Sequence, residues 1–139
     1  MKDIEKTVGN LIEKSKTSLI SSIDSDGFPN TKAMLKVRRR EGIKYLYFST
    51  NTSSMRVKQY LANNKACVYF YDSKFYKGVM LIGTMEVLQD KETRKSIWQL
   101  GDLIYYHKGV NDPDYSVLKF TATRGRYYNN FKSEDFYVE

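Results

Sequence analysis

Hydroxyl and basic side chains gather between positions 50 and 56, where a strand-like run gives way to a helix-like one. Thr50 and Ser54 carry hydroxyl groups, and Arg56 falls in the first turn of the expected helix. The start of a helix presents backbone N–H groups without intrahelical partners, and its dipole attracts an anion. Because a guanidinium group binds phosphate in bidentate fashion, the segment suits a phosphate site. It equally suits a plain helix cap with an exposed arginine, and the residues alone leave both interpretations open.

Other residues that could do chemistry have simpler interpretations. His107 stands in a polar loop, where a single histidine is typically exposed and idle, and Cys67 lies in an apolar run typical of a small core residue. The segment Asp24-Ser25-Asp26-Gly27 predicts a turn and not a calcium loop, because Pro29 and Leu35 occupy the positions that need Gly and Glu. One cysteine and one histidine cannot form a Cys/His zinc cluster. We therefore expect no metal site and name no catalytic residue.

The basic run Lys36-Val37-Arg38-Arg39-Arg40 admits two interpretations. It could bind a phosphate backbone, with aromatic residues on neighbouring strands stacking the bases of a single-stranded nucleic acid. The simpler interpretation is a solvated turn between two strands. Because the chain lacks a Lys/Arg-Gly-aromatic-Gly/Ala sequence of the RNA-recognition type, we do not expect a nucleic-acid partner.

The composition predicts one globular domain over residues 1–139. The chain has 23 Lys and Arg against 16 Asp and Glu, and its net charge of +7 favours an anionic partner. Aromatic residues make up 14% of the chain, which is ample material for a core, and a single cysteine excludes a disulfide scaffold. The charged first residues are unlike a signal peptide, and no run reaches the roughly 18 apolar residues of a membrane span. We therefore expect a cytoplasmic protein without a membrane association.

Periodicity and turn residues predict the elements that would position these side chains. Helices are expected over residues 3–15, 53–61 and 90–100, the last of them ended by Gly101. Strands are expected over residues 18–23, 28–37, 43–48, 66–71, 79–88, 115–121 and 124–129, with a turn at 38–42 and a bulge at Gly83. A parallel sheet would need helical crossovers, which are missing between the first three strands. The pattern therefore predicts an α+β fold, an antiparallel barrel of about six or seven strands with three flanking helices.

Four motifs then occur in a familiar order and spacing. They are Gly27–Met34, Tyr47–Asn51 together with Ser54–Val57, Val79-x-x-x-Gly83-x-x-Glu86, and Gly125–Tyr128. From about residue 8 to residue 130 the chain resembles the pyridoxamine 5′-phosphate oxidase-like FMN-binding split-barrel superfamily. Within it, the chain is most similar to the short general-stress-protein-26-like branch. The resemblance implies a split β-barrel and a homodimer that holds FMN in the groove between its two chains.

The resemblance also implies roles for individual residues. Lys32 would meet the FMN phosphate, and the strand positions Ala33, Met34 and Leu35 would flank the isoalloxazine ring. The end of the third strand and the phosphate clamp would be formed by Ser49, Thr50, Ser54 and Arg56. The partner chain would lend Lys77 and Gly78, and Tyr128 would stand beside the flavin. Tyr45, Tyr47, Tyr69 and Tyr71 would supply dimer surface.

The chain also departs from the true oxidases of that superfamily. After Tyr128 it lacks an Arg-x-His segment, and Val37 stands where a second basic residue is expected, with Lys36 one place earlier. We therefore expect an FMN-dependent oxidoreductase that acts on an unidentified small molecule and not on pyridoxamine phosphate. The alternatives are a non-catalytic module that binds or stores flavin, deazaflavin or haem, and the nucleic-acid barrel considered above.

Overall fold

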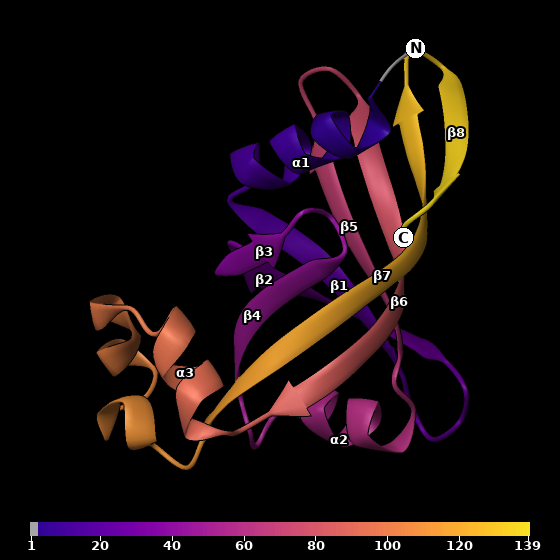
Figure 1. Ribbon diagram of the computed structural model, residues 1–139. Helices are drawn as coiled ribbons and strands as arrows, with labels where there is room; N and C mark the ends of the chain where they lie inside the picture. Colours follow the sequence, from indigo (N-terminus) through magenta and orange to yellow (C-terminus); the bar gives the residue numbers. More distant parts are fainter. Residues whose placement is uncertain (1–2) are drawn as a thin grey trace.

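The computed structural model describes residues 3–139 (Figure 1). Within them lie three α-helices, α1 (Ile4–Lys14), α2 (Met55–Ala62) and α3 (Lys91–Ile97), and two 3₁₀ helices, η1 (Leu100–Ile104) and η2 (Gly109–Asn111). The same residues form eight strands: β1 (Thr17–Ile23), β2 (Pro29–Leu35), β3 (Arg39–Glu41), β4 (Tyr45–Asn51), β5 (Lys65–Asp72), β6 (Lys77–Leu88), β7 (Tyr115–Asn129) and β8 (Lys132–Tyr137). The predicted α+β antiparallel fold is confirmed.

Each α-helix begins directly after a residue whose side chain caps it. The side chains of Asp3, Ser54 and Asp90 accept hydrogen bonds from backbone N–H groups in the first turns of α1, α2 and α3. The predicted apolar stripe of α1 is buried, with Val8 and Ile12 fully enclosed. Capping and amphipathic burial together explain why these three segments are helical.

The strands form one antiparallel sheet in the order β2-β1-β5-β6-β7-β4-β3, with β8 added to β7. The two ends of this order, β2 and β3, are consecutive in the chain. From Leu35 to Arg39 the chain spans at most roughly 14 Å, whereas seven strands laid flat would separate their outer members by about 29 Å. The sheet must therefore curl until its two edges approach each other without pairing, which gives a split barrel (Figure 1).

Two hydrophobic clusters fill the fold. The larger one lies inside the barrel, where α1 and α2 pack, and includes Ile12, Phe48, Tyr60, Phe70 and Phe120. The smaller one lies under α3 and the 3₁₀ helices and includes Tyr47, Ile97, Tyr106, Tyr115 and Val117. Since β4 and β7 contribute residues to both clusters, they join the barrel to the helical lobe.

The bulge predicted at Gly83 is confirmed. The register between β6 and β7 shifts between Ile82 and Gly83. A Cβ atom at position 83 would lie 1.8 Å from the Thr121 carbonyl oxygen, so only glycine lets the two backbones approach this closely.

Four details of the sequence prediction were wrong. The segments 115–121 and 124–129 form one continuous strand, β7, and the segment after it forms the unpredicted strand β8. The expected turn at 38–42 contains the short strand β3, which pairs with β4. Gly101 does not end a helix but lies within η1, because α3 ends at Ile97.

In the part described, residues 3–139, no helix is long and apolar enough to span a membrane.

Candidate functional site

The turn from β4 into α2 is tied to the start of β7. The Asp114 carboxylate accepts hydrogen bonds from the Ser53 backbone N–H at 2.8 Å and from the Asn51 amide at 2.9 Å. The bond from Asn51, with the contribution of Ser53, lowers the pKa of Asp114. Ser54 caps α2 by accepting a hydrogen bond from the Val57 N–H at 3.4 Å. Asp114 was missed by the sequence analysis, because nothing local marks a residue that acts on a turn about sixty positions away.

Arg56 is held at the start of α2 by a residue of the neighbouring strand. Its Nη2 atom donates to the Thr50 Oγ1 atom at 3.0 Å, and Thr50 is only 2% exposed. The Arg56 Nε atom is buried and has no hydrogen-bond partner among residues 3–139. A buried charged donor without an acceptor is unfavourable, and the first turn of α2 contains no acidic residue that could offset it. An anion bound at this point would satisfy both the guanidinium and the helix N-terminus.

Lys32 shares the side of the sheet that α2 covers. The Tyr60 hydroxyl donates to the Ser21 carbonyl oxygen at 2.9 Å, and Ser22 bonds Gln59, so α2 lies along β1. Lys32 pairs across the strands with Ile20, which is buried inside the barrel. Paired residues point to the same face of a sheet, so the Lys32 side chain projects to the side on which Arg56 begins its helix. Unlike Arg56, Lys32 is exposed.

The other β2 residues of the predicted site lie on a free sheet edge. Within the described chain, β2 pairs with β1 alone, so its outer backbone groups face away from the ladder. Met34 points inward and is buried, whereas Ala33 and Leu35 are exposed on the outer face. A flat heterocycle with polar edges would find both peptide donors and apolar surface along this strand.

Ser49 and Thr50 project to opposite faces of β4. Thr50 points toward Arg56, while Ser49 shares the face of Tyr47, under the helical lobe. Of this predicted pair, the structure therefore brings only the Thr50 side chain to Arg56.

The remaining predicted residues, Lys77, Gly78 and Tyr128, lie at the other end of the barrel. Gly78 pairs with Tyr128 across β6 and β7, whereas Thr50 pairs with Ser116 at the start of β7. Ser116 and Tyr128 are twelve residues apart on one strand, which corresponds to about 40 Å. One chain therefore cannot bring both groups to one small ligand.

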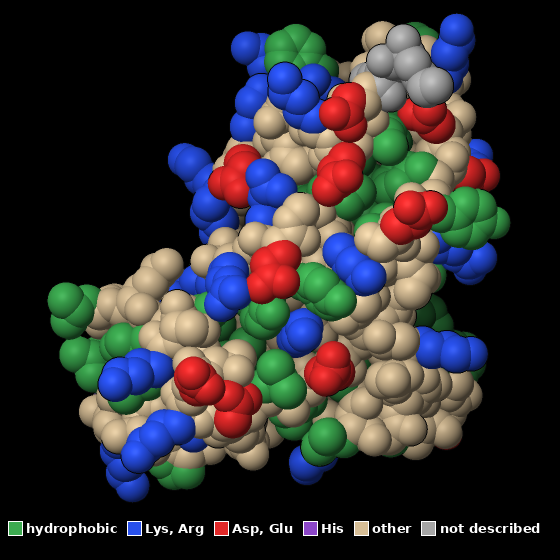
Figure 2. All heavy atoms as spheres, viewed as in Figure 1, with side chains coloured by type: hydrophobic (Ala, Val, Ile, Leu, Met, Phe, Trp, Pro, Cys, Tyr) green, Lys and Arg blue, Asp and Glu red, His purple; other side chains and the backbone are tan. Residues whose placement is uncertain are grey.

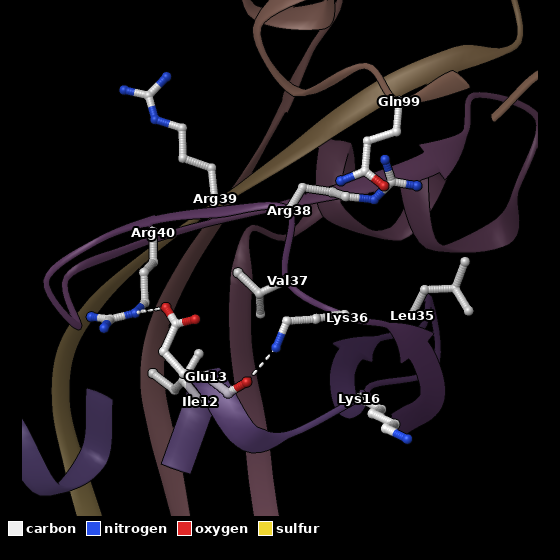
Figure 3. Close-up of a pocket in the computed structure, with 10 residues that line it drawn as sticks. All are labelled: Ile12, Glu13, Lys16, Leu35, Lys36, Val37, Arg38, Arg39, Arg40 and Gln99. Atoms are coloured by element: carbon white, nitrogen blue, oxygen red, sulfur yellow. Dashed lines mark hydrogen bonds and ion pairs between the residues drawn. The ribbon is translucent and has the colours of Figure 1, made fainter. Parts of the chain in front are cut away.

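The basic run is braced against the rest of the molecule. Arg38 forms a buried ion pair with Asp102, with Nη1 to Oδ2 at 2.9 Å, and Arg40 Nε lies 2.6 Å from the Glu13 carboxylate. Lys36 donates to the Glu13 carbonyl oxygen, as Figure 3 shows. These contacts surround a cavity of about 450 Å³. The run is therefore occupied in joining α1, β3 and η1. The predicted solvated turn is wrong, because the Arg38 side chain is buried and Arg39 and Arg40 belong to β3, and the contacts of the run do not favour a phosphate-backbone grip.

The simpler interpretations of His107 and of the Asp24 turn fit the structure, whereas that of Cys67 does not. His107 is exposed. Cys67 is only half-buried and lies outside both hydrophobic clusters, so its prediction as a core residue was wrong, although burial still raises the pKa of its thiol. Asp24 forms the predicted turn, since its Oδ1 atom accepts from the backbone N–H groups of Asp26 and Phe28, and Gly27 has a φ of +85°. Among residues 3–139, no group of three His, Cys, Asp or Glu side chains is arranged to hold a metal ion.

The sequence and fold of this chain match those of known proteins. The model of the family described as "pyridoxamine 5′-phosphate oxidase like" matches residues 3–138. A Clostridium acetobutylicum protein related to general stress protein 26 superimposes with a TM-score of 0.89 at 38% identity, covering 97% of this chain and 94% of that one. General stress protein 26 of Bacillus anthracis gives 0.82 at 17% identity, with 99% and 100% covered.

A pyridoxamine 5′-phosphate oxidase-related, FMN-binding protein of Nostoc punctiforme has the same fold, with a TM-score of 0.76 at 10% identity and coverage of 100% and 98%. No curated protein matches the chain. The match over residues 3–138 and the 38% identity to the clostridial protein agree with the four motifs. The chain belongs to the pyridoxamine 5′-phosphate oxidase-like family, in its general-stress-protein-26-like branch.

Proposed function

We propose that this protein is an FMN-binding flavoprotein whose phosphate site is built by Thr50, Ser54, Arg56 and Lys32. The buried and unpartnered Nε atom of Arg56 carries the proposal, because it needs an acceptor at the N-terminus of a helix. Lys32 adds a second positive charge on the same side of the sheet. A dianionic phosphate ester supplies the acceptor oxygens and the charge that this arrangement lacks.

The isoalloxazine ring fits along the free edge of β2. Ala33, Met34 and Leu35 offer unpaired peptide groups there, and Ala33 and Leu35 add exposed apolar side chains, whereas Ser49 lies under the helical lobe and is left out of the proposed site. Bound FMN supplies hydride and electron transfer, whereas this chain supplies binding, orientation and charge. The similarity to an FMN-binding member of the fold supports the assignment.

A second copy of the chain completes the proposed site with Lys77, Gly78 and Tyr128. The outer face of β1, β5 and β6 supports this homodimer, because it holds a mostly apolar cavity of about 500 Å³ that includes Ile23, Cys67 and Ile82. Tyr69 and Tyr71 are exposed and extend this surface, as expected. Tyr47 is buried and Tyr45 is half-buried, so the prediction that Tyr45 and Tyr47 belong to the dimer surface is not supported.

We further propose an oxidoreductase activity on a small molecule other than pyridoxamine phosphate. The sequence offers no convincing acid or base, so the reaction would depend on the flavin. Storage of haem is less well supported, because the single histidine, His107, is exposed in the loop after α3 and distant in sequence from the site.

Arg56→Met tests the phosphate assignment. It keeps most of the apolar stem but removes the charged donors, so FMN binding should weaken by about 1.5–3 kcal/mol, roughly 10- to 150-fold. Riboflavin, which lacks the phosphate, should bind both proteins equally. Fluorescence titration measures both ligands, and Arg39→Met, which breaks an exposed pair with Glu41, is the control. Equal FMN affinity in the Arg56 variant and the wild type would refute the assignment.

A further inference from the structure

Two hairpin tips meet at the end of the barrel opposite α2. The β5–β6 loop covers residues 73–76, and the β7–β8 turn is formed by Asn130 and Phe131. The tips are adjacent because Gly78 pairs with Tyr128. They enclose a cavity of about 400 Å³ whose lining is Lys74, Phe75, Tyr76, Tyr128, Asn130 and Phe131. The cavity is large enough for a small organic ligand.

Both tips hold an aromatic residue in a backbone conformation that favours glycine. Asn130 and Phe131 have φ values of +52° and +62°, as a two-residue hairpin turn with a primed geometry requires, and Tyr76 has a φ of +52°. Glycine is the usual residue at the second turn position, and a bulky side chain in this region is strained. Phe131 is nevertheless 95% exposed and Tyr76 81% exposed, so neither ring offsets the backbone strain by packing in the core.

Positive charge accompanies the rings. The Nζ atoms of Lys74 and Lys77 each lie 5.4 Å from the centre of the Phe75 ring. In Figure 2, hydrophobic and Lys or Arg side chains lie together at the top of the molecule, over the β5–β6 turn. Exposed ring faces beside ammonium groups are the chemistry that binds a flat aromatic anion.

We propose that the two tips form a binding platform for a planar aromatic anion, with Phe131 and Tyr76 as the stacking surfaces and Lys74 and Lys77 as the charge partners. The strain at Phe131 is retained because the ring is needed for the ligand. This proposal rests on the proposed function, which puts Tyr128 beside the flavin of the partner chain. The substrate would then be a planar aromatic anion.

The proposal predicts that Phe131→Gly changes stability and binding in opposite directions. Relief of the backbone strain should raise the Tm by about 2–5 °C. Affinity for anthraquinone-2-sulfonate, a planar aromatic anion, should fall about tenfold in calorimetric titration, with cyclohexanesulfonate as the charged but non-planar comparison. FMN affinity should stay within about twofold, because Phe131 is not among the residues proposed to contact FMN. Tyr137→Ser removes an equally exposed ring from a regular strand and should leave binding unchanged.

Unchanged anthraquinone-2-sulfonate affinity in Phe131→Gly overturns the proposal, as does equal binding of cyclohexanesulfonate. Phosphatidylserine vesicles test a lipid surface instead. If they bind the wild type and not Phe131→Gly, while the aromatic anion binds both, the tips are a membrane contact and the proposal is wrong. If the wild type binds the aromatic anion but no FMN, the platform stands and the flavin assignment fails.

Discussion

The α2 end of the barrel and the hairpin-tip end differ in how their side chains are satisfied. At the α2 end, Thr50, Ser54 and Asp114 accept hydrogen bonds from neighbouring groups, and the buried Arg56 Nε atom has no acceptor among residues 3–139. At the tips, Phe131 and Tyr76 are strained and exposed. The first end is organised around a buried donor, whereas the second presents exposed rings. Substitutions at the two ends should therefore have opposite effects on stability.

The largest effect should come from breaking the frame that joins the two ends. Gly83→Val places side-chain atoms where the Thr121 carbonyl oxygen lies, 1.8 Å from the position of a Cβ. Because backbone cannot yield as a flexible side chain does, we expect a loss of about 3 kcal/mol or more in the free energy of unfolding, measured by urea denaturation. Gly101→Ala is the control, since a Cβ there meets nothing within 4 Å. A Gly83→Val protein as stable as the wild type would contradict the close approach of β6 and β7.

A smaller loss should follow from Thr50→Val at the α2 end. The substitution keeps the shape of the side chain but removes the acceptor for the Arg56 guanidinium, at a position that is 2% exposed. We expect the free energy of unfolding to fall by about 1–3 kcal/mol. Thr123→Val, which removes an exposed hydroxyl bond to the Ile82 carbonyl, should have little effect. If Thr50→Val is equally destabilising in an Arg56→Met background, the two residues are not coupled and the description of this end is wrong.

The smallest effect concerns the Asp114 carboxylate. Its pKa is lowered by the bonds from Asn51 and Ser53, so it stabilises the fold above the unfolded-state pKa of about 3.9 and loses this contribution as the pH falls through the folded-state value. Asp114→Asn should therefore lower the Tm at pH 7 by a few degrees, and the difference from the wild type should shrink toward pH 3. Asp135→Asn, which breaks an exposed pair with Arg126, should change little at either pH. A difference for Asp114→Asn that stays constant with pH would exclude the carboxylate as its cause.

Local signals made much of the fold predictable. The side chains of Asp3, Ser54 and Asp90 cap helices through bonds to residues nearby in the sequence, so they do not depend on the rest of the fold. The glycine bulge at Gly83 interrupts a clear strand pattern. In contrast, β3 and β8 are polar edge strands held by backbone pairing to β4 and β7. Their sequences, Arg39–Glu41 and Lys132–Tyr137, lack the apolar alternation that marks a strand with a buried face.

The candidate site was predictable to the extent that neighbours in the chain form it. The short segment from Thr50 to Arg56 yields a real contact between those two side chains. Two features depend on strand pairing, which no single segment encodes. One is the hydrogen bond from the Ser53 backbone to Asp114, and the other is the separation of Tyr128 from Arg56 by the length of the barrel. The roles of Lys32, Lys77 and Gly78 toward FMN remain predictions.

Mixing two damaged chains tests the central claim, that the α2 end of one chain and Lys77, Gly78 and Tyr128 of another make one flavin site. Arg56→Met damages one half, and the double variant Lys77→Met/Tyr128→Ala damages the other. Each variant alone should lose high-affinity FMN binding. In an equimolar co-refolded mixture, random pairing makes half of the dimers mixed, each with one intact site, so about one quarter of the sites should bind FMN with wild-type affinity. A mixture that recovers no such sites, or a double variant that by itself binds FMN as the wild type does, would contradict the account.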